Sequence, residues 1–170
     1  TDGHIAFIGA GGSGKTVALR ALAVAAASTL AGGPVHVYAL DFASGGLRML
    51  ERLPHVGAVI AGDDAARVQR LLRTLRAQLE DRARRYSAVS AASIAEYRRV
   101  AERPGEPRIL LLVDGLTAFR DEWELAIGRS GAYDAFRELL AEGRRVGIHV
   151  AVTADRPGAL PPSLAARVPR

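Results

Sequence analysis

Residues 9–16 constrain the fold more than any other stretch of this chain. Their sequence, Gly-Ala-Gly-Gly-Ser-Gly-Lys-Thr, fits the phosphate-binding pattern Gly-x-x-x-x-Gly-Lys-Thr at every defined position. An apolar run at 5–8 precedes the loop, and an Ala-, Leu- and Val-rich stretch from Val17 follows it. The pattern therefore stands between a predicted buried strand and a predicted helix, which is the context of a phosphate-binding loop. A simple Gly-rich turn, in a chain with 18 glycines, is the weaker interpretation.

The residue types of this loop match the chemistry of a nucleoside triphosphate bound with Mg²⁺. Glycines let consecutive backbone N–H groups approach a phosphate, and we expect the closest approaches at Gly12 and Gly14. The helix that starts near Lys15 adds free N–H groups, Lys15 can reach the β- and γ-phosphates, and Thr16 offers a hydroxyl to Mg²⁺. The predicted nucleotide-binding residues are Gly9, Gly11, Gly12, Ser13, Gly14, Lys15, Thr16 and Val17.

Composition sharpens this interpretation. The chain has 23 basic residues, and all of them except Lys15 are arginines. The lysine at position 15 supports a phosphate-binding role for the loop, since a planar guanidinium is a poor substitute for a compact ammonium there. The net charge of +5 permits contact with DNA or acidic surfaces without demonstrating it.

Length and composition predict a single domain over residues 1–170. A chain of 170 residues that is 49% hydrophobic can build one substantial core, and it has no apolar run of membrane-spanning length. It has no cysteine, which excludes disulfides and thiolate metal sites and is compatible with the cytosol.

The rest of the chain alternates between predicted strands and predicted helices. We expect strands at 35–40, 53–60, 108–114 and 149–153. The expected helices are one from 17 to the Gly-Gly-Pro at 32–34, one that begins after Asp63 or Asp64, one from Ser93 through Glu102, one around 122–127 and one across 132–142. This alternation predicts an α/β fold with a mostly parallel sheet, whose ligands bind at the carboxyl ends of the strands.

The run at 109–113 is continuously apolar and ends in Asp114, as expected of a central parallel strand that delivers a carboxylate. In a protein with a phosphate-binding loop, that carboxylate holds the Mg²⁺ shell. We expect Thr16, Asp114 and Thr153 to meet at one edge of the sheet. Thr16 and Asp114 are the predicted metal residues, and Lys15, Asp114 and Thr153 are the predicted catalytic residues.

The helix that follows Asp63 or Asp64 carries a row of arginines opposite its apolar face, at 67, 70, 73 and 76. A nucleic-acid-binding face is one interpretation. A solvated outer face is favoured, because Glu80 and Asp81 interrupt the charge and no aromatic residues lie among the arginines.

Further segments occur in the order found in the FtsK/SpoIIIE motor family, which the chain resembles over nearly its whole length. They are Leu40-Asp41-Phe42 followed by two glycines, 53–56, Arg84-Arg85-Tyr86, 93–97, the strand ending at Asp114, and 153–157. Asp41-Phe42 followed by Gly45-Gly46, in place of the Asp-Pro-Lys of the DNA pumps, and Asp114-Gly115 resemble the EccC-type ATPase modules of bacterial type VII secretion.

This resemblance implies a P-loop NTPase fold of the RecA/FtsK type, a three-layer sandwich that binds ATP and Mg²⁺. It also implies one module cut from a tandem array on a membrane-anchored chain, on the cytosolic face, with part of the C-terminal sheet edge absent. Neighbouring modules and secreted proteins or their signal segments would be its partners, and a ring oligomer would fit the family. A DNA-translocating motor is the alternative, in which DNA is a partner that the sequence does not favour.

One departure from the family concerns hydrolysis. DNA-pumping members place a glutamate directly after the strand-end aspartate, where it activates the attacking water, whereas this chain has Gly115. Glu122 and Glu124 would substitute only if the chain folded back. We therefore expect ATP binding with weak or regulated hydrolysis. Glutamate at position 115 should raise hydrolysis, provided that the backbone there does not require a positive φ.

Overall fold

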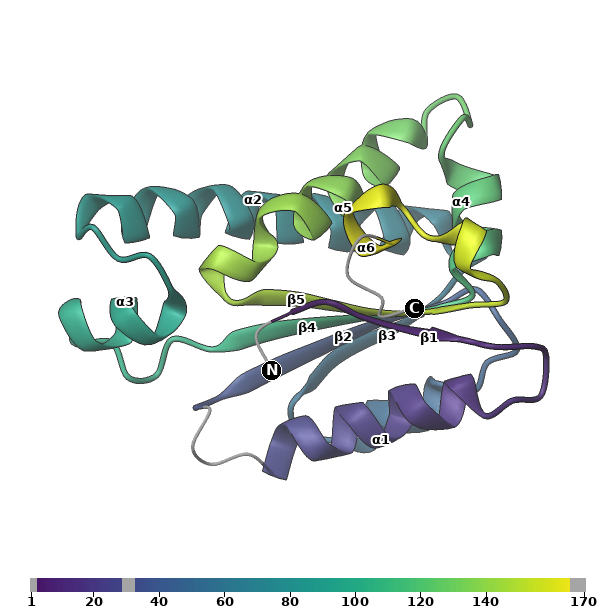
Figure 1. Cartoon of the computed structure of the whole chain (residues 1–170), viewed down its shortest axis with the longest axis horizontal. Coiled ribbons are helices and arrows are strands. Elements are labelled where there is room, and N and C mark those ends of the chain that lie inside the picture. The colour runs from purple at the N-terminus through teal and green to yellow at the C-terminus, as the bar shows by residue number, and fades with distance from the viewer. Residues whose placement is uncertain (1–2, 29–32, 166–170) are drawn as a thin grey trace.

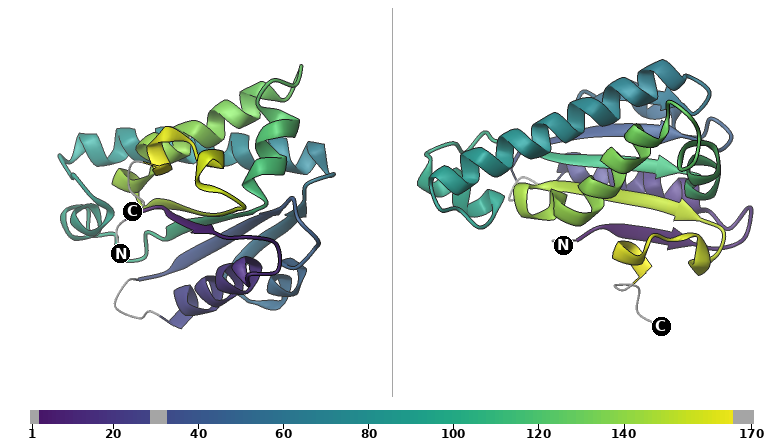
Figure 2. Two further views of the ribbon diagram at one scale, coloured as in Figure 1. Left: turned by 45° about the vertical axis from the view of Figure 1, so that its right-hand side comes forward. Right: turned by 90° about the horizontal axis from the view of Figure 1, so that it is seen from above.

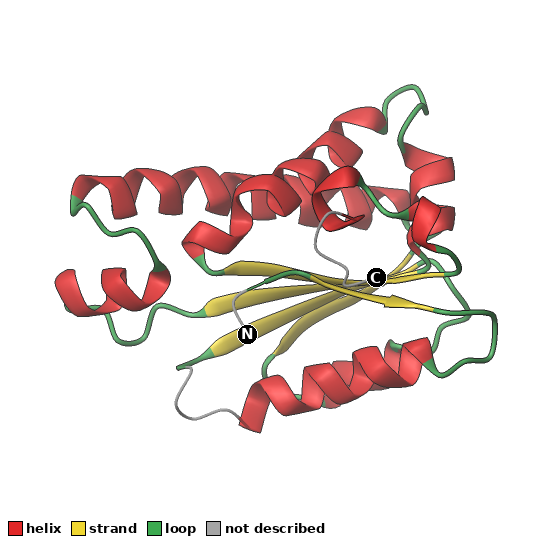
Figure 3. Cartoon of the chain, viewed as in Figure 1, coloured by secondary structure: helices red, strands yellow, loops and turns green. Residues whose placement is uncertain are grey.

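The computed structural model describes residues 3–28 and 33–165, which form a five-stranded sheet between two layers of helices (Figures 1 and 3). The strands lie in the order β1-β5-β4-β2-β3, and every pairing is parallel. The predicted α/β three-layer sandwich is confirmed. In chain order the elements are β1 (Ile5–Ile8), α1 (Lys15–Ser28), β2 (Val35–Asp41), η2 (Arg48–Arg52), β3 (Val56–Ala61), α2 (Ala65–Ala88), α3 (Ile94–Val100), β4 (Arg108–Asp114), α4 (Leu116–Trp123), α5 (Ser130–Glu142), η3 (Gly143–Val146), β5 (Ile148–Ala154), η4 (Pro157–Ala159) and α6 (Pro162–Ala165).

Helices cover both faces of the sheet, which explains the continuous apolar runs in its central strands. Figure 2 shows α1 on one face and α2 and α5 on the other. In β4, Leu110 and Leu112 pack into the core beneath α1, whereas Leu111 and Val113 pack into the larger core beneath α2 and α5. Because successive strand residues point to opposite faces, β4 needs an apolar side chain at every central position.

Helix α2 follows its predicted pattern. Its buried residues include the whole predicted apolar row, Val68, Leu71, Leu72, Leu75 and Leu79. Asp64, one of the two candidate caps, accepts a hydrogen bond from the backbone N–H of Arg67 at 3.1 Å. Arg67, Arg70 and Arg73 are exposed, and the half-buried Arg76 pairs with Glu138 at 2.9 Å.

The predicted helix around 122–127 is wrong in its position. Helix α4 begins earlier, at Leu116, and ends at Trp123, while Leu125 and Ile127 lie exposed in the connection to α5. The reason is packing: Leu116, Phe119 and Trp123 recur at helical spacing and are completely buried, so the helix lies where it buries these three side chains.

Other predicted boundaries differ by a few residues. The strand expected at 53–60 is β3, which begins at Val56 because Leu53 takes part in a turn, accepting a hydrogen bond from Val56 N at 3.0 Å. Helix α3 ends at Val100 rather than Glu102, and its predicted cap at Ser93 accepts from Glu96 N at 3.2 Å. The predicted helix stop at 32–34 falls partly outside the described residues, and the expected absence of part of the C-terminal sheet edge falls wholly outside them.

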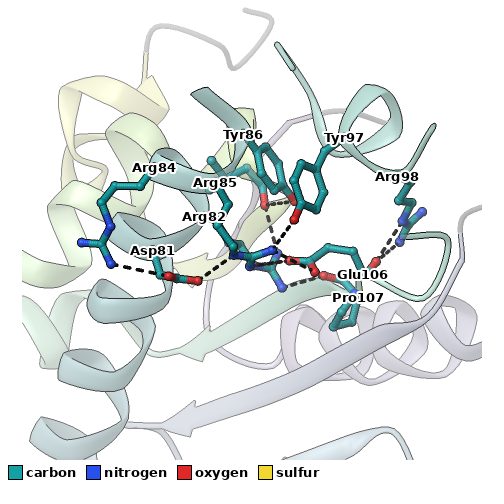
Figure 4. A network of polar contacts seen from close by, with 10 residues as sticks. Asp81, Arg82, Arg84, Arg85, Tyr86, Tyr97, Arg98, Glu106 and Pro107 are labelled. Atoms are coloured by element: carbon teal, nitrogen blue, oxygen red, sulfur yellow. Dashed lines mark hydrogen bonds and ion pairs between the residues drawn. The ribbon is translucent and has the colours of Figure 1, made fainter. Parts of the chain in front are cut away.

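The Arg84-Arg85-Tyr86 segment lies at the end of α2 that is remote from the phosphate-binding loop (Figure 1). Figure 4 shows that it belongs to a polar network which fastens α3 and the turn before β4 to α2. Arg85 contacts Asp81 at 2.8 Å, Glu106 at 2.9 Å and the Tyr97 hydroxyl at 2.9 Å. These contacts connect one side chain of α2 to two separate segments.

Arg82 is the buried arginine of this network, with 4% of its side chain exposed. Its guanidinium donates to the carbonyl oxygens of Val146 at 2.9 Å and Pro107 at 2.8 Å and pairs with Glu106 at 3.3 Å. A buried charge is tolerated only with such partners. Beside it, Tyr86 stacks on Tyr97 with ring centroids 4.2 Å apart, and burial raises the pKa of Tyr86 to about 12.

Candidate functional site

The phosphate-binding loop joins the carboxyl end of β1 to the amino end of α1, as the motif predicts. Gly12 and Gly14 have φ values of 77° and 85°, which other residues rarely adopt. A Cβ at Gly9 would lie 2.7 Å from Ser13 Oγ, so any larger residue there would force the Ser13 side chain to move. Residues 10–14 are exposed at the tip of the loop.

Lys15 is the first residue of α1, and its side chain folds back over the loop. The ammonium donates to the carbonyl oxygens of Gly9 at 2.5 Å and Ala10 at 2.8 Å, and it pairs with Asp155 Oδ1 at 3.2 Å. Sequence reasoning assigned no role to Asp155. It directly follows the strand that delivers Thr153, and this position was the only available signal.

Thr16, Asp114 and Thr153 come together at the carboxyl edge of the sheet, as expected from parallel strands. Thr16 Oγ1 donates to Asp114 Oδ2 at 2.7 Å, and Thr153 Oγ1 donates to Asp114 Oδ1 at 2.6 Å. Asp114 and Thr153 are buried, with 2% and 1% exposed. The two hydroxyls therefore hold both carboxylate oxygens in place.

A threonine hydroxyl and a carboxylate are hard oxygen ligands of the kind that Mg²⁺ prefers, with phosphate oxygens and water completing the shell. Thr16 and Asp114 already lie within hydrogen-bond distance of each other, so one small cation can contact both. The donor set therefore fits Mg²⁺ bound together with a nucleotide. Within residues 3–28 and 33–165, no group of three or more His, Cys, Asp and Glu side chains could hold a metal ion.

The Thr153 hydroxyl both accepts and donates a hydrogen bond. Its oxygen accepts a hydrogen bond from the backbone N–H of Gly115 at 2.8 Å while its hydroxyl donates to Asp114. The side chain thus ties β5 to the residue that follows β4. Its predicted role in positioning water stays a prediction.

Glutamate at position 115 was expected to raise hydrolysis only if the backbone there does not require a positive φ, and the structure does not meet this condition. Gly115 has a φ of 85° and caps the amino end of α4 in the left-handed region. A Cβ there would lie 3.1 Å from both the carbonyl carbon and the oxygen of Phe42. Backbone atoms cannot move aside as a flexible side chain can. The expectation that glutamate at 115 would simply raise hydrolysis is therefore not supported, because any side chain there is strained.

Asp41 has a structural task that sequence reasoning did not assign. Its carboxylate accepts hydrogen bonds from the backbone N–H groups of Ala43 at 3.1 Å, Gly45 at 3.3 Å and Leu47 at 3.0 Å, which shapes the loop after β2. That loop lies against the phosphate-binding loop, since a Cβ at Gly46 would be 2.6 Å from Thr16 Cγ2. Gly46, which has no side chain, allows this close approach, whereas Gly45 has a positive φ of 78° and no such contact.

The other residues considered from the sequence lie outside the centre of the site. Val17 follows Thr16 in α1 and is 55% exposed, whereas Glu122 and Glu124 are exposed at the far end of α4. The chain does not fold back to bring these glutamates to Asp114, because α4 leads away from Gly115 (Figure 1). In the described part of the chain, no helix is both long and apolar enough to cross a membrane.

Comparisons with known proteins agree with this geometry. The chain is 33% identical over 165 residues to the ESX-4 secretion system protein EccC4 of Mycobacterium tuberculosis, covering 95% of this chain and 13% of that protein. It is 33% identical over 161 residues to the ESX-1 secretion system protein EccCb1 of Mycolicibacterium smegmatis, covering 91% of this chain and 26% of the relative. The chain thus spans a small part of each relative.

A solved structure with the same fold comes from Thermomonospora curvata. It is EccC, ATPases 2 and 3, in complex with a signal sequence peptide, with a TM-score of 0.82 and 30% identity over 97% of this chain and 30% of that one. The sequence profile of the FtsK/SpoIIIE family matches residues 1–169. The chain therefore belongs to the FtsK/SpoIIIE family.

Proposed function

We propose that this chain is an ATP-binding module of an EccC-like type VII secretion ATPase, acting in protein export with weak or regulated hydrolysis of Mg-ATP. The observation that carries the proposal is the phosphate-binding loop with Thr16 Oγ1 2.7 Å from the Asp114 carboxylate. The family membership and the EccC relatives support it. As in the T. curvata relative, which carries two ATPases and was solved with a signal peptide, neighbouring modules and signal segments are the proposed partners.

In this proposal the N–H groups of the loop and the Lys15 ammonium bind the phosphates, and Thr16 and Asp114 hold Mg²⁺. Bound Mg²⁺ would neutralise charge on the β- and γ-phosphate oxygens. Thr153 orients the Asp114 carboxylate through its 2.6 Å hydrogen bond. The module would work on the cytosolic side of the membrane as one of several modules of a longer chain, and a ring of such chains is the proposed assembly.

Weak hydrolysis is proposed because no glutamate follows Asp114, and the carboxylate of Asp41, which is in register with Asp114 on β2, already accepts hydrogen bonds from three backbone N–H groups. Gly115 has no side chain, and the Thr153 hydroxyl cannot act as a base at neutral pH. General-base catalysis contributes about 10²–10⁴-fold, so its loss would leave binding intact and hydrolysis slow. A neighbouring module could supply the missing group, which would make hydrolysis regulated.

Calorimetry tests the binding proposal. Lys15→Ala should remove measurable Mg-ATP binding, since the ammonium is the charged contact to the β- and γ-phosphates. Arg20→Ala is the matched control, because Arg20 lies on the same helix and reaches Met49 instead of the loop. Arg20→Ala should bind like the parent. Equal binding by Lys15→Ala and the parent would show that the loop does not hold the nucleotide.

A quenched single-turnover assay of the parent tests the hydrolysis proposal. We expect slow turnover by the isolated module and faster turnover once neighbouring modules are added. Rapid turnover by the module alone would contradict the proposal.

The alternative, a DNA-translocating motor, predicts a different result. The exposed arginines of α2 are mixed with acidic partners, such as the pair of Arg67 and Asp64 at 3.8 Å. We expect only weak DNA attraction that disappears at physiological salt. Binding that persists there, with a steep dependence of log affinity on log salt, would favour the motor.

A further inference from the structure

The ammonium of Lys15 already has three oxygen atoms close to it. It donates hydrogen bonds to the carbonyl oxygens of Gly9 at 2.5 Å and Ala10 at 2.8 Å, and it forms an ion pair with the Asp155 carboxylate at 3.2 Å. A phosphate that binds Lys15 must therefore approach next to this carboxylate or displace it.

Asp155 is held beside the loop by the sheet. Ile8, the last residue of β1, is in register with Ala154, the last residue of β5. The first residue of the loop, Gly9, then donates its backbone N–H to the Ala154 carbonyl at 3.1 Å. Asp155 is the next residue along the chain, so the parallel pairing of β1 with β5 places its carboxylate next to Lys15.

The two partners of this ion pair differ in exposure. The Lys15 side chain is 13% exposed and the Asp155 side chain is 72% exposed, so the carboxylate reaches the ammonium from the solvent side. Lys15 provides the only ion pair of Asp155 within residues 3–28 and 33–165. Once a phosphate binds Lys15, no second cationic side chain in that part of the chain pairs with the Asp155 carboxylate.

We propose that Asp155 is a positioning residue that competes with the nucleotide phosphates for Lys15. The proposal rests on the ATP-binding function proposed above. With nucleotide absent, the carboxylate pairs with the ammonium that Gly9 and Ala10 hold over the loop. On binding, the β- or γ-phosphate contacts the ammonium and repels the carboxylate, because both carry negative charge. Asp155 thereby lowers the affinity of the site for Mg-ATP.

The expected size of the effect follows from the exposure of Asp155. Exposed ion pairs contribute little, so removing the competing charge should lower the Kd for Mg-ATP about two- to fivefold at low ionic strength. Salt screens charges that face solvent. The gain should therefore shrink towards zero at about 1 M salt, where the Debye length falls to about 3 Å.

The variant for the test is Asp155→Asn, which keeps the shape of the side chain and removes its charge. Asp134→Asn is the control. Like Asp155, Asp134 is exposed and forms an ion pair, in its case with Arg137 at 3.8 Å, but it lies on α5 outside the site. Because Lys15 is the single lysine of the chain, lysine labelled with ¹³C and ¹⁵N gives one side-chain NMR signal, which reports on this ammonium without nucleotide. Any tag must contain no lysine.

The lysine signal of the nucleotide-free protein should shift in Asp155→Asn and stay in place in Asp134→Asn. Calorimetry with Mg-ATP on the same samples should then show tighter binding only for Asp155→Asn. An unmoved lysine signal would show that the ion pair does not form, and a shifted signal with unchanged or weaker binding would show that the pair does not compete with phosphate. Each result overturns the proposal.

The two proposals fail in different ways. If Mg-ATP binds to neither the parent nor Asp155→Asn, the proposed function fails and the competition fails with it. If Mg-ATP binds and depends on Lys15, but Asp155→Asn binds no more tightly, the ATP-binding function stands and only the role of Asp155 is refuted.

Discussion

Replacing Gly115 by alanine should destabilise the protein by about 1–3 kcal/mol. Gly115 has a φ of 85°, and a residue with a Cβ pays about 1–2 kcal/mol in the left-handed region. The added Cβ would also approach the Phe42 carbonyl carbon and oxygen to 3.1 Å, which is tighter than normal contact with rigid backbone atoms. Gly115→Ala should therefore lose more free energy of unfolding than the left-handed backbone conformation alone would explain.

Gly128→Ala separates these two contributions. Gly128 has a φ of 77°, and a Cβ there would meet nothing within 4 Å, so this variant carries the backbone cost without the close contact. Urea unfolding of the parent and both variants gives the two free energies of unfolding. If Gly115→Ala loses no more stability than Gly128→Ala, the contact with Phe42 is not a constraint and the argument from packing is refuted.

The same reasoning applies to Gly115→Glu, which adds a longer side chain to the strained position. We expect this variant to be at least as destabilised as Gly115→Ala and no faster than the parent in single-turnover hydrolysis. A stable Gly115→Glu protein that hydrolyses ATP faster than the parent would show that the backbone adapts to the glutamate, contrary to the structure.

Thr153→Val should destabilise the protein by about 1–3 kcal/mol in urea unfolding, because it leaves the part-buried Gly115 N–H without its acceptor and removes a donor from the buried Asp114 carboxylate. Thr153→Ser should retain most of the stability. Burial raises the pKa of Tyr86 from 10.0 to about 12, so the folded state holds the phenolic proton more tightly than the unfolded state. The resulting stabilisation is present below pH 10 and is lost as the pH rises to 12. Over that window the free energy of unfolding should fall less in Tyr86→Phe than in the parent, and the difference between the two falls should reach about 2–3 kcal/mol. An identical fall in both proteins would contradict the raised pKa.

Local sequence was sufficient for the phosphate-binding loop, because glycines, a lysine and a threonine at fixed spacing specify the backbone and the chemistry together. It was also sufficient for most elements, since apolar runs such as 109–113 and the apolar row of α2 encode burial by their own periodicity. The meeting of Thr16, Asp114 and Thr153 followed from one further rule, that parallel strands present their carboxyl ends at a single edge.

Other features depend on partners that are distant in the sequence, and no local pattern contains them. Lys15 meets Asp155 because β1 pairs with β5, and Gly115 must stay a glycine because the backbone of Phe42 lies against it. The tertiary structure alone decided these features, because strand order and packing bring together backbone and side chains from different segments, and those contacts limit what each position can hold.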